Sequence, residues 1–63
     1  MKKENIKIGY TYEIRGNFVI VTNILNGEIE VADVEFNEDG EPQAIKGTEN
    51  FLTDFEVKHL KDE

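Results

Sequence analysis

The stretch that most constrains the fold is residues 18–36, in which two apolar segments flank the dipeptide Asn26-Gly27. A tight two-residue hairpin turn needs positive φ at both central positions, and Asn and Gly tolerate that conformation. The twist of such a turn also matches the twist of the strands that it joins. We therefore predict two antiparallel β-strands folded back on each other at Asn26-Gly27.

The segment before this hairpin alternates strictly between apolar and polar residues from 6 to 15. The apolar positions are Ile6, Ile8, Tyr10, Tyr12 and Ile14. Period two predicts a strand with one apolar face, with a bend at Gly9 and a tight turn at Gly16-Asn17. The next strand, residues 18–25, is apolar on both faces over its first four residues, which is typical of a central strand covered on both sides.

The third strand changes its inward register part-way along. Ile29 and Val31 are odd-numbered, whereas Val34 and Phe36 are even-numbered. Because a one-residue slip sends every later side chain to the other face, a β-bulge at Ala32-Asp33 is the simplest interpretation. That bulge would turn four acidic side chains outward on one face: Glu28, Glu30, Asp33 and Glu35.

The C-terminal third predicts a turn, a short strand and a helical turn. Residues 37–42 have the composition of a turn, and residues 43–47 predict a strand that starts near Pro42 and points Ile45 inward. Phe51, Leu52 and Phe55 suit one face of a short helix within residues 48–55, followed by a strand at 56–60, with both Phe rings closing a barrel. Alternatively, Thr53-x-x-Glu56 matches a capping box and places the helix at residues 54–60.

These elements predict a single small domain over residues 1–63, with fraying at 1–5 and 61–63. Five isolated glycines separate four or five short strands. The fold class is mainly β: a small antiparallel meander of four or five strands that curls into a small barrel, with one short helical turn near the C-terminus.

The order of strands, tight hairpin, bent strand, acidic turn and helical turn resembles the small SH3-like and Tudor-like barrels. It also resembles short bacterial and phage proteins with the pattern G-x-x-Y-x-I-x-G-x-x-V-x-V-x-x-I. Its positions are occupied here by Gly9, Tyr12, Ile14, Gly16, Val19, Val21 and Ile24. The resemblance implies a binding module rather than an enzyme. Because the chain has no Trp, we do not assign the proline-binding groove of SH3 domains or the methyl-lysine cage of Tudor domains.

The net charge of −7 is concentrated in the middle of the chain. Between Arg15 and Lys46 there is no Lys or Arg, and the interval holds seven acids, whereas the remaining seven acids are balanced by seven bases. The acids are Glu28, Glu30, Asp33, Glu35, Glu38, Asp39 and Glu41. The negative electrostatic potential of these acids disfavours nucleic acid and anionic membranes as direct partners and favours a protein with a basic surface. No apolar run approaches the length of a membrane span, and we expect a cytoplasmic protein.

The residue types of catalytic and metal sites are sparse. His59 is the only histidine, there is no Cys, and the isolated glycines form no phosphate loop. The acids of residues 37–41 lack the spacing of a calcium loop, and a solvated turn explains them. We expect no enzymatic activity, no cofactor and no metal.

Three functions remain as hypotheses. The first is a non-catalytic module that binds a protein through the seven acids above, with Tyr10 or Tyr12 as anchors, although a place in the core is the default for both rings. The second is an acidic inhibitor that mimics DNA, as small phage anti-defence proteins do. The third is an oligomeric barrel that sequesters a small ligand through Arg15, Lys46 or Lys58. The unpaired edge strands of a small sheet also allow a homodimer.

Overall fold

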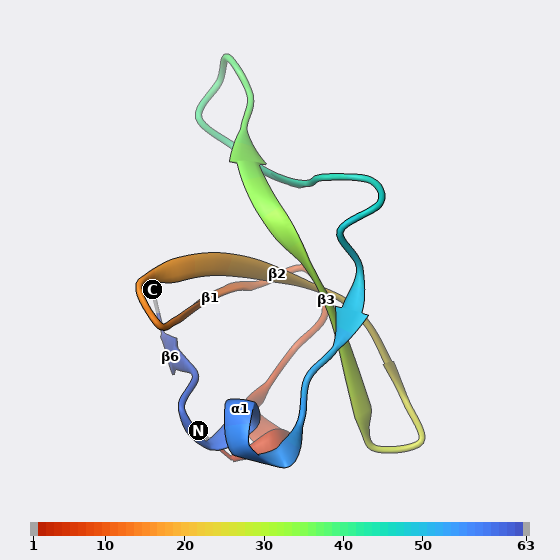
Figure 1. Ribbon diagram of the computed structural model, residues 1–63. Helices are drawn as coiled ribbons and strands as arrows, with labels where there is room; N and C mark the ends of the chain where they lie inside the picture. Colours follow the sequence, from red (N-terminus) through yellow and green to blue (C-terminus); the bar gives the residue numbers. More distant parts are fainter. Residues whose placement is uncertain (1, 63) are drawn as a thin grey trace.

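A computed structural model describes residues 2–62 of the chain (Figure 1). In chain order the elements are the 3₁₀ helix η1 (Lys3–Asn5), β1 (Thr11–Ile14), β2 (Asn17–Leu25), β3 (Glu28–Phe36), β4 (Pro42–Ala44), β5 (Asn50–Phe51), α1 (Asp54–Lys58) and β6 (Lys61–Asp62). None of the helices within the described residues has the length and apolar character that crossing a bilayer requires.

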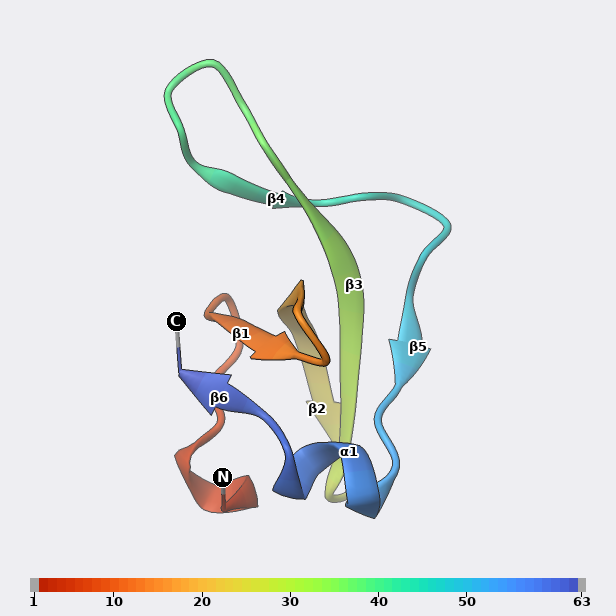
Figure 2. The same cartoon turned by 60° about the vertical axis from the view of Figure 1, so that its left-hand side comes forward.

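The strands form one antiparallel sheet in the order β4-β3-β2-β1-β6, and β5 also pairs with β3. The predicted mainly-β meander with one short helix is therefore confirmed. The sheet is curved, and its short strands β5 and β6 lie with α1 along the same side of the curve (Figures 1 and 2). Within residues 2–62 no ladder joins β5 to β6, so the sheet stays open and its closure into a barrel is not confirmed.

Two tight turns organise the first three strands. Asn26 and Gly27 have φ of 51° and 80°, which confirms the predicted hairpin turn between β2 and β3. The turn between β1 and β2 lies one residue earlier than predicted, because Ile14 pairs with Asn17 and the central residues are Arg15 and Gly16. Arg15 consequently adopts a φ of 53°, a left-handed conformation that is costly for a residue with a Cβ.

The predicted bulge at Ala32-Asp33 is wrong. Pairing between β2 and β3 is continuous there, with Ala32 opposite Ile20, and the irregularity lies in β2 between Val21 and Asn23. Thr22 is the extra residue, and its hydroxyl donates a hydrogen bond of 2.7 Å to Oε1 of Glu30 on the opposite strand. The register change in the sequence of β3 is therefore not a local bulge of that strand.

The core is made by residues from five segments that pack on the concave face of the sheet. Its members are Ile6, Tyr12, Ile14, Val19, Val21, Ile29, Val31, Val57 and Leu60. Ile8 and Tyr10, which were predicted to point inward, are 55% and 60% exposed. The alternation fails because Gly9 has a φ of 88° in a turn, so that the regular strand begins only at Thr11.

The preferred placement of the C-terminal helix within residues 48–55 is wrong, and the capping-box alternative is correct. The Thr53 hydroxyl accepts a hydrogen bond of 3.2 Å from the backbone N–H of Glu56. The Glu56 carboxylate accepts one of 3.0 Å from the backbone N–H of Thr53. Phe51 lies in β5, and both Phe51 and Phe55 are exposed, so neither ring closes a barrel. Val57 and Leu60 instead cover the core.

Both ends of the described chain contain secondary structure that the sequence did not predict. Residues 3–5 form η1, and Nζ of Lys3 lies 3.1 Å from a carboxylate oxygen of Asp54 at the start of α1. Residues 61 and 62 form β6, which pairs with β1 rather than remaining a solvated tail. The predicted fraying at Met1 and Glu63 lies outside the described residues.

Candidate functional site

The end of β3 and the whole of β4 project from the body of the protein as a two-stranded arm, which we define as residues 34–44. In this arm Val34 pairs with Ala44 and Phe36 pairs with Pro42. Figures 1 and 2 both show the arm extending beyond the rest of the sheet, and the molecule measures 33 × 20 × 17 Å along its principal axes. The arm is therefore accessible on both of its faces.

The loop at the tip of the arm is held in shape by Asn37. Its side-chain oxygen accepts hydrogen bonds of 2.9 Å from the backbone N–H groups of both Asp39 and Glu41. Its backbone N–H donates to the carbonyl of Glu41, and its carbonyl accepts from Gly40. The exposed carboxylates of Glu38, Asp39 and Glu41 are thus presented on an ordered loop.

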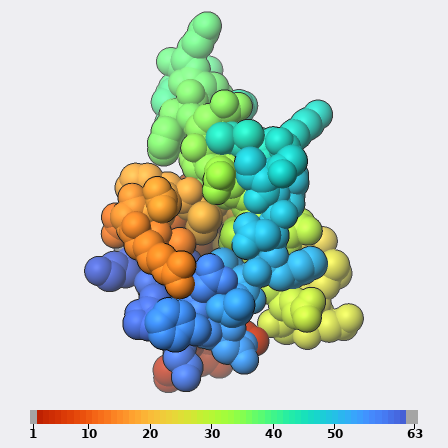
Figure 3. Space-filling model, viewed as in Figure 1, coloured from red at the N-terminus to blue at the C-terminus, as the bar shows by residue number. Residues whose placement is uncertain are grey.

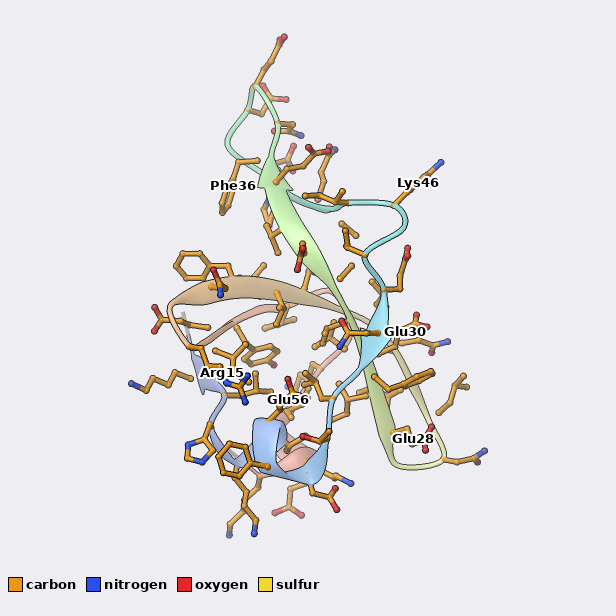
Figure 4. The ribbon with its side chains drawn as sticks, viewed as in Figure 1. Arg15, Glu28, Glu30, Phe36, Lys46 and Glu56 are labelled. Carbon is orange, nitrogen blue, oxygen red and sulfur yellow. The ribbon has the colours of Figure 1, made fainter. Side chains whose placement is uncertain are left out.

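One face of the arm is apolar. Val34 and Phe36 lie on the same face of β3, and their cross-strand partners Ala44 and Pro42 share it, because directly paired residues point to the same side. Phe36 is 53% exposed, and Figure 4 shows its ring at the side of the arm. The arm therefore presents an exposed aromatic ring beside a carboxylate-rich loop.

The other predicted acids do not form one row. Because the register runs through Ala32-Asp33 without a bulge, Glu28 and Glu30 lie on one face of β3, whereas Asp33 and Glu35 lie on the other. Figure 4 places Glu28 at the β2–β3 turn and Glu30 farther along β3 beside β5, both away from Phe36. Glu30 is half-buried and bonded to Thr22, whereas the other three are exposed.

The two tyrosines named as candidate anchors have different environments. Tyr12 is only 2% exposed, and its hydroxyl accepts a hydrogen bond of 3.1 Å from the backbone N–H of Lys7. It is a core residue, which is the default interpretation. Tyr10 is exposed but lies just before β1, in a different part of the sheet from the arm.

A cleft of about 570 Å³ opens at the base of the arm. Its wall includes apolar side chains, among them Val19, Val31 and Leu52, together with five polar residues. The polar residues are Arg15, Asn17, Asp33, Asn50 and Glu56. In Figure 3 the β1–β2 turn (orange) and the segment around β5 (light blue) lie on either side of this region. The volume is within the range of small-ligand pockets.

Sequence reasoning did not find this cleft. Its polar residues come from five separate segments, namely the β1–β2 turn, β2, β3, β5 and α1, and no spacing along the chain links them. Among residues 2–62, no group of three or more His, Asp or Glu side chains is placed to hold a metal ion.

Comparisons of the chain with protein-family models, with curated proteins and with solved structures find no match.

Proposed function

We propose that this chain is a non-catalytic protein-binding module whose arm contacts a partner with a basic surface. The observation that carries the proposal is the combination, on one projecting element, of the exposed Phe36 ring and the ordered carboxylates of Glu38, Asp39 and Glu41. Aromatic side chains supply much of the energy at protein interfaces, and surrounding charges steer the partner and select it.

The shape of the arm also supports this proposal. An ordered loop loses less conformational entropy on binding than a mobile one, and Asn37 already fixes the backbone of this loop. The outer edge of β4 adds unpaired backbone groups along Pro42–Ala44, although Pro42 has no N–H to donate. A strand of the partner protein could pair with this edge. A second copy of the chain could also pair there, which would give the homodimer predicted from the sequence.

The fold that we propose for this module is an open form of the SH3-like barrel. The last strand lies beside the first, and a short helix precedes it, which supports that arrangement. Binding domains of this kind present loops and sheet edges from a rigid scaffold.

The DNA-mimic hypothesis has less support from the geometry. Alternate residues on one face of a strand are about 6.8 Å apart, which already gives a sparse copy of phosphates spaced at about 3.4 Å. The division of the acids of β3 between two faces makes any single row sparser still. We retain the protein-binding function as the proposal.

The experiment compares two variants of equal charge. The arm variant carries Glu38→Gln, Asp39→Asn and Glu41→Gln, and the control carries Glu4→Gln, Glu13→Gln and Glu49→Gln. Each removes three negative charges from the net charge of −7 and keeps the side-chain shapes. Affinity capture on the unmodified protein supplies a partner, whose dissociation constant is then measured for each variant by calorimetry.

We expect the arm variant to weaken binding at least tenfold and the control to change it less than threefold. Phe36→Ala should also weaken binding at least tenfold, at unchanged stability, because the ring is mostly exposed. Equal losses in the arm variant and the control would mean that net charge alone attracts the partner, and the arm would then have no specific role.

A further inference from the structure

The polar side chains around the cleft have hydrogen-bonding capacity that the protein itself does not use. Within residues 2–62, the Arg15 guanidinium, the Asn17 amide and the Asp33 carboxylate make no side-chain hydrogen bond or ion pair. Asn50 makes one long contact of 3.5 Å to the adjacent Phe51 carbonyl. Oε1 of Glu56 accepts the capping bond of α1.

Arg15 and Glu56 face each other across the cleft. Figure 4 shows the Arg15 side chain directed toward the side of α1 that carries Glu56, and no ion pair joins the two residues. The position of Arg15 depends on its left-handed conformation in the β1–β2 turn. That conformation costs on the order of 1 kcal/mol for a residue other than Gly, Asn or Asp. Strained residues of this kind are concentrated at binding sites.

The set of donors and acceptors matches the backbone of an extended peptide. A guanidinium donates to a peptide carbonyl, a carboxylate accepts from a peptide N–H, and each Asn amide can do both. The accessible apolar wall is formed by the half-buried Val34, Ile45 and Leu52. In an extended peptide alternate side chains point the same way, so every second side chain can face this wall. Asp33 and Glu56 outnumber Arg15 at this site, so the charge favours a segment that carries basic residues.

We propose that the cleft binds an extended peptide segment in which apolar and basic residues alternate. Arg15 and the two Asn amides would contact its backbone, and Asp33 and Glu56 its backbone N–H groups or basic side chains. This inference rests on the proposed protein-binding function, and it adds a second contact with the same class of partner. Because the cleft lies at the base of the arm, a single partner can occupy both surfaces.

The test uses a blocked hexapeptide of alternating valine and lysine, titrated into isotope-labelled protein and followed by NMR. Two control peptides replace lysine by glutamate or valine by serine. The side-chain amide resonances of Asn17 and Asn50 report directly on the cleft, and the backbone resonances of residues 37–41 report on the arm. The cleft variant carries Asp33→Asn and Glu56→Gln; Gln can still accept the capping bond of α1.

We expect the valine-lysine peptide to shift the Asn17 and Asn50 side-chain resonances, and both control peptides to bind at least tenfold more weakly. The cleft variant should weaken binding of the valine-lysine peptide at least fivefold, whereas the arm variant should leave the cleft shifts in place. Absence of shifts at millimolar peptide, shifts confined to residues 37–41, or equal binding of the serine-lysine peptide would each overturn the inference. The proposed function is tested separately, by the dissociation constant of the arm variant for its captured partner.

Discussion

The side chain of Thr48 holds the base of the arm against the body through the backbone of Asp33. Oγ1 of Thr48 accepts a hydrogen bond of 2.9 Å from the N–H of Asp33, and it donates one of 2.7 Å to the carbonyl of Ile45. The N–H of Ile45 in turn donates to the carbonyl of Asp33 at 2.9 Å. One hydroxyl therefore connects the strand that enters the arm with the segment that leaves it.

Replacing this hydroxyl tests its structural role. Thr48→Val keeps the shape of the side chain and removes both hydrogen bonds, leaving a backbone N–H without its partner. Because the N–H of Asp33 is exposed and water can replace the hydroxyl, we expect a loss of about 0.5–1.5 kcal/mol in the free energy of unfolding, measured by urea denaturation. Thr48→Ser retains the hydroxyl and should cost less than half as much; equal losses in the two variants would assign the effect to the methyl group.

Replacing Arg15 is expected to raise the stability of the fold rather than lower it. Its φ of 53° suits Asn better, so Arg15→Asn should stabilise the fold by about 0.5–1 kcal/mol. For a domain of this size, that corresponds to a rise of roughly 2–8 °C in the melting temperature. Arg15→Lys keeps the unfavourable conformation and should show no rise in calorimetry. A loss of stability in Arg15→Asn would mean that the guanidinium makes a stabilising contact.

Two isoleucines with contrasting burial test whether Ile8 lies outside the core, as the structure shows. Ile29 is 2% exposed and Ile8 is 55% exposed. Ile29→Ala should cost about 2–5 kcal/mol, enough to unfold a substantial fraction of so small a domain. Ile8→Ala should stay within about 0.5 kcal/mol of the unmodified protein. A comparable loss in both, seen by circular dichroism during thermal unfolding, would place Ile8 in the core after all.

The capping box of α1 distinguishes between the two helix placements. Thr53→Ala removes the acceptor for the N–H of Glu56 and should cost about 0.5–2 kcal/mol, measured by denaturant unfolding. Thr53→Ser keeps that acceptor and should restore most of the loss. If Thr53→Ala proves neutral, Thr53 is not the N-cap of α1.

Two local features could be predicted from the sequence, because each depends on the conformational preference of one or two residues. The Asn26-Gly27 turn was predicted directly, whereas the Thr53–Glu56 capping box was the alternative placement of the helix, and the β1–β2 turn was predicted one residue too late. Asn26-Gly27 accepts positive φ, and Thr53 with Glu56 satisfies the free N–H groups at a helix start; both features appear in the structure as the residues indicate. The mainly-β class followed from period-two alternation for the same local reason.

Only the tertiary structure decided which side chains share a face and which segments meet. Which side chains of β3 face the core depends on how that strand pairs with β2. The extra residue that shifts this pairing is Thr22 in β2, so the sequence of β3 alone does not show it. The cleft draws Arg15, Asp33 and Glu56 from three distant segments. Such proximity is set by packing and register, whereas sequence patterns report the conformation of the chain near each residue.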